Sequence, residues 1–486
     1  MQKSGVKFGT SGARGLASDM TDRICCAYTY GFLQYLESVD DVSKGQPVAV
    51  AGDLRPSTER IMSAVATAIS NSGYTPINCG RIPSPAVALK GLKDTIPSIM
   101  VTGSHIPADR NGIKFNKSTG EILKSDEEGI RNQIIALDDS FFDETGYFAG
   151  PVSPLPEIDP GARQIYIERY LDFFPQEILS GIRLGVYQHS AVGRDILVDI
   201  FKGLGAEVIP LGRSDRFIPV DTEAIREKDV ALAARWCGEQ DFFSIVSTDG
   251  DSDRPLISDE KGNWLRGDVA GILAAQFLEA DSVSTPISCN SALEECGHFA
   301  EIRRTRIGSP YVVEAMNKAV QAGARMAVGY EANGGFLTNS PLLKDSRILE
   351  PLPTRDAVIV HLSVILLARK YGVTISQLIR TLPNRYTASD RLKEFALERS
   401  SAILDRFRTG SEEEDRKAIG DVFGDLCGEV ASIDRTDGIR ITFENREIVH
   451  LRPSGNAPEF RCYTEASTNE RAAALNGLVL EKLRNF

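Results

Sequence analysis

The sequence has 486 residues, 42% of them hydrophobic, which is enough for several domains with cores of their own. Asp and Glu outnumber Lys and Arg by 67 to 55, and the resulting net charge of −12 argues against a nucleic-acid partner. No apolar run is long enough to span a membrane, the first residues form no apolar signal segment, and the eight Cys have no CxxC spacing. We therefore expect a cytoplasmic protein with no membrane partner.

Short apolar runs alternate with amphipathic helical patterns over most of the chain. Strands are expected at 47–52, 98–102, 183–187, 207–210, 243–247, 287–289, 301–304 and 326–329. Helices are expected at 57–72, 126–136, 193–204, 269–278, 311–322 and 357–371. This alternation predicts α/β units with mainly parallel sheets and with binding sites at the carboxyl ends of their strands.

The C-terminal part of the chain has a different pattern. Four closely spaced strands precede a helix at 469–483, which is typical of an antiparallel α+β domain; the strands are expected at 429–433, 438–443, 447–451 and 459–465. A proline-rich segment from Gly150 to Pro156 marks one domain boundary. We predict four domains, which cover residues 1–150, 151–257, 258–372 and 373–486.

The first of several glycine-containing loops, FGTSGARG, runs from Phe8 to Gly15. Its small residues leave backbone N–H groups accessible, and the hydroxyls of Thr10 and Ser11 and the guanidinium of Arg14 can join them around an anion. Taken alone, the segment fits an ordinary flexible start equally well.

A second loop follows the apolar strand expected at 98–102. Ser104 stands on the turn after that strand, where its hydroxyl can face a cleft, but a serine hydroxyl is a weak nucleophile that needs activation. His105 and Lys114 are close in sequence, although neighbours on an extended chain point in opposite directions. Asn111-Gly112 is a turn signal that would fold Lys114 back over Ser104. The alternative is a loop serine beside a surface histidine.

The third loop, VSTDGDSDRP, begins as a strand and then places Asp249, Asp251 and Asp253 at alternate positions around Gly250. Three crowded carboxylates repel one another unless a cation lies among them. Oxygen donors without His or Cys favour Mg²⁺ over zinc. A solvated acidic turn is the alternative, whereas a calcium loop of the EF-hand type lacks its later Glu.

Two more loops come later in the chain, GYEANGGF and LRPSGNAPEFR. In the first, Glu331 and Asn333 offer an acceptor and an amide, a pairing suited to sugar hydroxyls. In the second, Arg452, Ser454 and Arg461 surround a Gly-Asn turn and predict a phosphate clamp. Each loop alone also fits a plain hairpin turn.

As an ordered set at roughly the usual spacing, these loops resemble those of the α-D-phosphohexomutase family, which includes phosphomannomutase, phosphoglucomutase and phosphoglucosamine mutase. TGSHIP at 102–107 with NGIK at 111–114 is similar to the family's T-[AG]-S-H-N-P and NG-x-K. DGDSDR at 249–254 matches DGD-x-DR, and TRIG at 305–308 matches T-x-[VI]-G. The resemblance covers the whole chain and implies three similar mixed α/β domains plus a C-terminal α+β domain around a central active-site cleft.

The chain departs from the family's usual loops at several positions. Ile106 stands where Asn is usual, and RPSGNAP replaces R-x-SGTEP, so that Asn456 takes the place of a hydroxyl. In the sugar loop, usually GE-x-SGH, Asn333 stands for Ser and Gly335 for His. These changes bear on the identity of the hexose more than on the reaction.

The resemblance implies reversible transfer of phosphate between O6 and O1 of a hexose through phosphoserine at Ser104 and a hexose 1,6-bisphosphate, which also acts as activator. Asp249, Asp251, Asp253 and a Ser104 phosphate oxygen would bind Mg²⁺. Lys114 would be the general acid and base, a role that requires a pKa below that of a free lysine. His105 would orient the loop, and Arg14 would act at the catalytic centre. The residues expected to contact the substrate are Arg254, Gly308, Glu331, Asn333, Arg452, Ser454, Gly455, Asn456 and Arg461.

Several functions compete. Conversion of mannose 6-phosphate to mannose 1-phosphate is our first expectation and the glucose reaction the second; the glucosamine branch commonly has Ser where this chain has Thr102. A Mg²⁺-dependent sugar-phosphate phosphatase could use the same Ser104, but hydrolysis needs no C-terminal clamp to reorient an intermediate. A non-catalytic sugar-phosphate-binding protein would not need Ser104, Lys114 and three aspartates together. Both a monomer and a homodimer fit the sequence.

Overall fold

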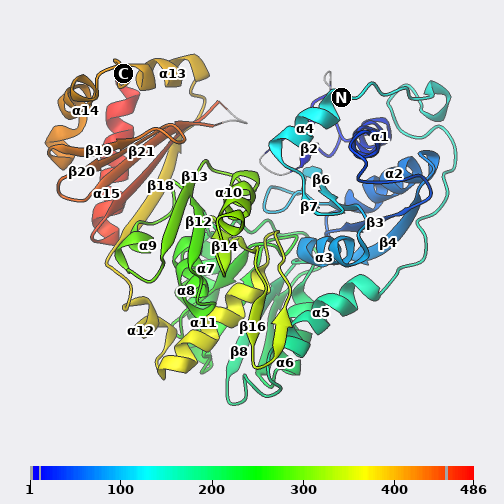
Figure 1. The fold of residues 1–486 in the computed structure, drawn as a ribbon, viewed down its shortest axis with the longest axis horizontal. Helices are drawn as coiled ribbons and strands as arrows, with labels where there is room; N and C mark the ends of the chain where they lie inside the picture. Colours follow the sequence, from blue (N-terminus) through cyan, green and yellow to red (C-terminus); the bar gives the residue numbers. More distant parts are fainter. Residues whose placement is uncertain (1–3, 10–11, 455–457) are drawn as a thin grey trace. The chain divides into compact units, whose positions relative to one another are not determined.

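The computed structural model describes residues 4–9, 12–454 and 458–486. The chain divides into two compact units, Met1–Val283 with Gly308–Leu378, and Ser284–Ile307 with Ile379–Phe486. Figure 1 shows helices and strands interleaved along most of the chain, which confirms the predicted mixed α/β class. The finer division into four domains stays a prediction. No helix in the described part of the chain has the length and apolar content needed to cross a membrane.

The first sheet of the first unit has the strand order β1-β2-β6-β5-β3-β4, with β7 beside β6. β3 pairs in parallel with β4 and β5, whereas β6 runs antiparallel to β5 and β2. Its elements are β1 (Lys7–Phe8), β2 (Ala13–Leu16), α1 (Asp22–Ser38), β3 (Pro47–Gly52), α2 (Thr58–Asn71), β4 (Thr75–Arg81), α3 (Ser84–Asp94), β5 (Ser98–Val101), β6 (Arg110–Lys117), β7 (Gly120–Glu121), α4 (Lys124–Arg131) and the 3₁₀ turn η1 (Asp139–Phe141). Apolar side chains of α1 and α2 pack with those of the strands into one core.

The antiparallel pairing of β5 and β6 brings the two ends of the loop that contains Ser104 close to each other. Lys114 lies opposite Met100, so that the chain passes Ser104 and returns beside it. The predicted turn at Asn111-Gly112 is wrong, because both residues belong to β6 and pair with β2. The reversal instead occupies the residues between β5 and β6. Asn111 gives a turn signal but uses its side chain to bind Ser57 and Thr58.

The rest of the first unit repeats the strand-loop-helix pattern. A second sheet has the order β11-β10-β8-β9, with β8 parallel to β9 and β10. Its elements are α5 (Gly161–Phe173), β8 (Arg183–His189), α6 (Arg194–Gly203), β9 (Glu207–Arg213), α7 (Glu227–Glu239), β10 (Ser244–Thr248) and β11 (Pro255–Ile257). Next in the unit are α8 (Gly267–Phe277), α10 (Ser309–Gln321), the hairpins β14 (Ala327–Tyr330) with β15 (Phe336–Thr338) and β16 (Leu342–Lys344) with β17 (Arg347–Leu349), and α11 (Ala357–Tyr371).

The second unit is built on an antiparallel sheet with the order β18-β22-β21-β20-β19, which confirms the α+β pattern at the C-terminus. Its elements are α9 (Ala292–Glu295), β13 (Glu301–Thr305), β18 (Tyr386–Leu392), α13 (Leu397–Asp405), α14 (Glu412–Cys427), β19 (Val430–Asp434), β20 (Ile439–Phe443), β21 (Ile448–Pro453), β22 (Phe460–Ala466) and α15 (Asn469–Arg484). β12 (Ser282–Pro286) and α12 (Ile375–Ile379) lie where the chain passes from one unit to the other.

Two predicted elements are wrong in their position. The strand expected at 287–289 is β12, five residues earlier, because buried small polar residues such as Ser284 and Thr285 hide the strand from an apolar pattern. The helix expected at 126–136 is α4, which ends at Arg131. Ile134, the apolar residue that extended the pattern, is 92% exposed and packs on no core.

Candidate active site

Ser104 lies at the start of the loop between β5 and β6. It is buried, and its φ of 53° is in the left-handed region, where a non-glycine residue needs support. That support includes the Thr102 hydroxyl, which accepts a hydrogen bond of 2.7 Å from the Ser104 N–H. The Ser104 Oγ donates to Oδ2 of Asp249 at 2.6 Å, and His105 Nδ1 lies 3.4 Å away. The structure thus places the candidate nucleophile directly on the aspartate loop.

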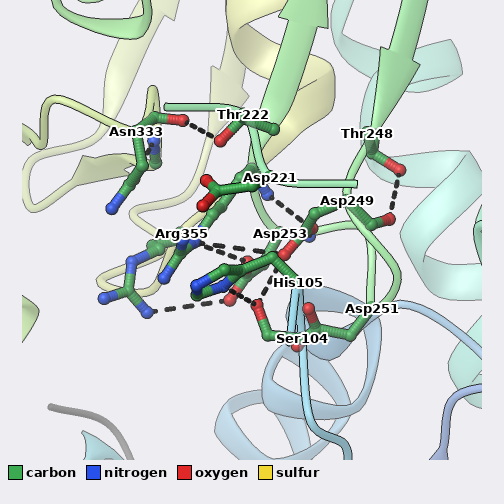
Figure 2. A network of polar contacts seen from close by, with 12 residues as sticks. Ser104, His105, Asp221, Thr222, Thr248, Asp249, Asp251, Asp253, Asn333 and Arg355 are labelled. Atoms are coloured by element: carbon green, nitrogen blue, oxygen red, sulfur yellow. Dashed lines mark hydrogen bonds and ion pairs between the residues drawn. The ribbon is translucent and has the colours of Figure 1, made fainter. Parts of the chain in front are cut away.

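Three carboxylates gather at the end of β10, as the sequence predicted. Oxygen atoms of Asp249, Asp251 and Asp253 all lie within 4.8 Å of one another, and Figure 2 shows them beside Ser104. In the described structure, one carboxylate oxygen (Oδ1) of Asp251 and of Asp253 is buried without a hydrogen-bond partner. Burial, together with the charges of the other two aspartates, raises the pKa of Asp249 well above its usual range. A metal ion would bind the carboxylate oxygens that lack a hydrogen bond and would reduce the repulsion among the three aspartates. The residues therefore fit a divalent cation.

Lys114 bridges two of these carboxylates. Its Nζ lies 2.6 Å from Oδ2 of Asp251 and 2.6 Å from Oδ2 of Asp253. Burial alone would lower the pKa of Lys114, but the two carboxylates outweigh burial and raise it. In this arrangement the pKa of Lys114 is therefore shifted away from the direction that the acid and base role requires. If a metal ion also bound Asp251 and Asp253, the two carboxylates would stabilise the charged form of Lys114 less, and its pKa would be lower.

The histidine next to the nucleophile is neutral. Burial, and after it the positive charges of Arg254 and Arg14, lower the pKa of His105 to about 2. A neutral imidazole at 3.4 Å from the Ser104 Oγ can orient the hydroxyl, and it adds no charge to the site. This is consistent with the orienting role that the resemblance implied.

Arg14 on β2 and Arg254 after the aspartate loop supply positive charge. Arg254 Nε lies 3.9 Å from Asp253 and 4.0 Å from Asp249, beyond hydrogen-bond distance. The Nε atoms of both arginines are buried and find no hydrogen-bond acceptor among the described residues. Burial and the neighbouring Arg254 lower the pKa of Arg14 to about 10, so that it stays charged near neutral pH. Unsatisfied guanidinium N–H groups of this kind suit a phosphate.

The sugar loop connects β14 to β15. Glu331 accepts a hydrogen bond from Nε of Arg355 at 2.5 Å, and a nitrogen of the same guanidinium (Nη1) lies 3.7 Å from Asp253. Asn333 braces the loop, because its side-chain oxygen accepts from the Gly335 N–H at 2.9 Å and its carbonyl accepts from the Thr222 hydroxyl at 2.6 Å. Figure 2 shows Asn333, Thr222 and Arg355 on the same side of the aspartate loop. Glu331 and Asp253 therefore share one cation.

Gly308 precedes α10 with a φ of 132°, a conformation that a side chain would rarely adopt. The loop containing Gly308 can therefore approach a ligand closely.

In the second unit, Arg452 on β21 lies directly opposite Arg461 on β22. Arg452 Nε is 3.5 Å from Asp437, Arg461 is 3.6 Å from Glu459, and the Ser454 N–H donates to the Glu459 carbonyl at 2.8 Å. Like charges at directly opposed positions of a sheet repel, and a bound anion offsets that repulsion. The predicted Gly455 and Asn456 lie outside the described residues.

Comparison with known proteins identifies the family. Residues 5–140, 266–386 and 405–482 match the profiles of phosphoglucomutase/phosphomannomutase alpha/beta/alpha domain I, alpha/beta/alpha domain III and C-terminal domain. The chain is 43% identical to a phosphomannomutase of Salmonella muenchen over 485 residues, 100% of this chain and 97% of that one. The chain belongs to the α-D-phosphohexomutase family. It is an isomerase of the phosphomutase type, as its loops implied.

Other phosphohexomutases extend the comparison. A phosphomannomutase of Sinorhizobium fredii is 41% identical over 97% of both chains, and a phosphoglucosamine mutase of Thermotoga neapolitana is 27% identical over 78% of this chain and 82% of that one. The crystal structure of a putative phosphomannomutase from Thermus thermophilus has the same fold, with a TM-score of 0.74, 20% identity and 99% coverage of each chain.

Sequence reasoning missed three side chains of this phosphohexomutase site. Ser84 donates to Oδ2 of Asp251 at 2.6 Å, and Arg55 donates to four carbonyls of the nucleophile loop. Arg355 joins the sugar loop to the aspartate loop. Of these three residues only Arg355 had a signal in the sequence, because the charged pair Arg355-Asp356 stands immediately before the apolar helix α11.

Proposed function

We propose that this phosphohexomutase interconverts mannose 6-phosphate and mannose 1-phosphate, with Ser104 as the residue that carries the phosphoryl group. The hydrogen bond of 2.6 Å between the Ser104 Oγ and Asp249, within a cluster of three aspartates, is the observation that carries the proposal. Two relatives that are 41% and 43% identical over nearly the whole chain are named phosphomannomutases, which favours mannose over glucose and glucosamine.

The metal of this site is proposed to be Mg²⁺, held by Asp249, Asp251, Asp253 and an oxygen of phosphorylated Ser104. Only oxygen donors are present in the cluster, and two of its carboxylate oxygens have no hydrogen-bond partner in the described structure. The ion would supply charge neutralisation as the phosphoryl group moves. An N-acetylphosphoglucosamine mutase of Aspergillus fumigatus, which shares the fold at 15% identity with a TM-score of 0.54, is described in complex with GlcNAc-6P and magnesium.

The remaining residues act on the sugar and on protons. Lys114, between Asp251 and Asp253, can hand a proton to the Ser104 oxygen or take one from a sugar hydroxyl once the carboxylates are shared with a cation. Arg14 and Arg254 stabilise the charge of the moving phosphoryl group through Nε–H groups that have no hydrogen-bond acceptor among the described residues.

Recognition of the substrate is assigned to three further groups of residues. Glu331 and Asn333 bind sugar hydroxyls, and Gly308 lies against the ligand. A clamp holds the phosphate that is not reacting; it comprises Arg452, Ser454, Gly455, Asn456 and Arg461. Such a clamp suits an intermediate with a phosphate at each end that must turn over between two transfers. Hexose 1,6-bisphosphate would therefore also serve as activator, because it rephosphorylates Ser104.

We also propose that the protein is cytoplasmic and acts as a monomer or homodimer. None of the eight Cys, all of which lie within the described residues, forms a disulfide, and six of them are buried, which agrees with a reducing compartment.

Initial rates with mannose, glucose and glucosamine 1-phosphates, each with a trace of the matching 1,6-bisphosphate, test the function. The highest kcat/KM is expected for mannose 1-phosphate. A higher value for either other sugar would refute the preference, while release of inorganic phosphate in place of the 6-phosphate would make the protein a phosphatase.

A further inference from the structure

Arg355 is a buried cation that the loop motifs do not include. It is 1% exposed, and the backbone on its C-terminal side is fixed by contacts of its neighbour Asp356. The Asp356 N–H donates to the Phe336 carbonyl at 2.9 Å, and the Asp356 carboxylate caps α11. The same carboxylate accepts hydrogen bonds from the Tyr166 and Tyr170 hydroxyls of α5. Arg355 therefore projects from a rigid point of the fold.

Its side chain lies across Gly335, the last glycine of the sugar loop. A Cβ atom added at Gly335 would lie 2.4 Å from Cδ of Arg355 and 2.8 Å from its Cγ, closer than carbon atoms approach. Gly335 is also the position at which the family's sugar loop usually has a histidine. The absence of a side chain at 335 is what lets Arg355 reach this side of the loop.

The guanidinium ends between two acidic loops. Nε binds Glu331 at 2.5 Å, and Nη1 is 3.7 Å from Asp253, an ion-pair distance too long for a hydrogen bond. Glu331 and Asp253 thus hold one edge of the guanidinium in place. In the part of the chain that the structure describes, Nη1 and Nη2 have no hydrogen-bond acceptor, so Arg355 has donors left for a ligand that enters between the loops.

We infer that Arg355 is a substrate-binding residue that orients Glu331 and donates through its Nη atoms to oxygens of the hexose phosphate, with Gly335 kept free of a side chain to admit it. The inference rests on the proposed function, since it names a further contact of the same site. Arg355 then supplies the cationic donor that the sugar loop itself lacks, and the choice of sugar depends on it. The fixed, planar fork of a guanidinium can hold Glu331 and the ligand at once, which a lysine cannot.

Four variants test this contact: Arg355→Ala, Arg355→Lys, Gly335→Ala and the double variant Gly335→Ala/Arg355→Ala. We expect Arg355→Ala to raise KM for mannose 1-phosphate by about ten- to a hundredfold, the usual effect of losing a charge-assisted hydrogen bond, with a smaller change in kcat. Arg355→Lys should recover part of the loss. Arg325→Ala, which removes an arginine that is 88% exposed in the same unit, is the matched control and should leave KM unchanged.

The double variant separates a steric role of Gly335 from other roles. Gly335→Ala should raise KM in the native background, because the new methyl group displaces Arg355. Once Arg355 is Ala, the same change should have little further effect on KM. If the KM of the double variant rose by the product of the two single increases, the two residues would act independently and the proposed coupling would be wrong.

Circular dichroism and thermal melting show which variants fold. If Arg355→Ala does not fold, Arg355→Lys carries the test through its KM and its mannose-to-glucose preference. Unchanged KM and preference in a folded Arg355 variant of an active enzyme would overturn this inference alone. An inactive native enzyme would overturn the proposed function as well.

Discussion

Arg55 is expected to control where Ser104 lies. It is fully buried with Asp53, and its Nε donates to Asp53 at 3.1 Å. Its two terminal nitrogens donate to four carbonyls of the nucleophile loop, at 2.7 Å for Ser104, 2.6 Å for Ile106, 2.6 Å for Pro107 and 3.0 Å for Arg110. All five N–H groups of the guanidinium are therefore used, and four of them hold the loop.

Loss of this side chain has two separate costs. Arg55→Met leaves Asp53 as a buried carboxylate without its cation, which costs about 3–5 kcal/mol of stability. Arg55→Lys keeps the charge but offers three donors for five acceptors, so it destabilises less while still releasing part of the loop. A shift of Ser104 by about 1 Å would lower kcat by about a hundredfold. We therefore expect Arg55→Lys to stay folded and to lose most of its kcat.

The assay combines denaturant unfolding with kcat under saturating mannose 1-phosphate and its 1,6-bisphosphate. Arg60→Lys is the matched control, because Arg60 also binds a carboxylate, Asp22, and two carbonyls, but at a distance from the nucleophile loop. It should lose stability without losing kcat. A folded Arg55→Lys protein with native kcat would refute the argument that these four hydrogen bonds place Ser104.

Three further variants test the roles assigned above. Ser104→Ala should lose at least about a thousandfold in kcat, and intact-mass analysis should place one added phosphate on the 102–107 peptide of the native chain only; phosphate found elsewhere would contradict the assignment. Asp251→Asn should abolish turnover without unfolding the chain, and chelation should silence the native enzyme until Mg²⁺ is restored; activity that ignores chelation would exclude the metal role. Arg452→Ala should raise KM about ten- to a hundredfold and increase the requirement for added bisphosphate, because the intermediate escapes before it turns; an unchanged requirement in the variant would count against the clamp.

The candidate site could be predicted where its chemistry lies in contiguous residues. The three aspartates follow β10 within five positions, and Ser104 follows β5, so a strand end and a short string of residues were enough to place them. Arg55 and Arg355 were missed for the opposite reason. Arg55 reaches the carbonyls of the nucleophile loop from 49 to 55 positions away in sequence. Arg355 reaches Glu331 from 24 positions away and Asp253 from 102 positions away (355 − 253), so no local pattern predicts either set of contacts.

The same limit applies to the pKa of Lys114. Its pKa depends on Asp251 and Asp253, which are 137 and 139 positions away in sequence, and both carboxylates are fixed by the fold rather than by the loop that contains Lys114. At the level of the fold, regular elements were predicted where apolar periodicity was continuous, as in α11. They were misplaced where buried polar residues broke the pattern, as in β12.

The charges of the site also explain how an acidic protein holds an anionic substrate. Four cations and four carboxylates meet in the first unit, namely Arg14, Lys114, Arg254 and Arg355 with Asp249, Asp251, Asp253 and Glu331. A phosphoserine brings a further charge of about −1.5 to −2, and a divalent cation brings the opposite. The phosphate or the divalent cation alone leaves uncompensated charge in a buried region, whereas both together keep the net charge of the site close to zero. We therefore expect Mg²⁺ to bind the Ser104-phosphorylated chain more tightly than Ser104→Ala when the two are compared by calorimetry. Equal affinities would show that the three aspartates bind the ion without help from the phosphate.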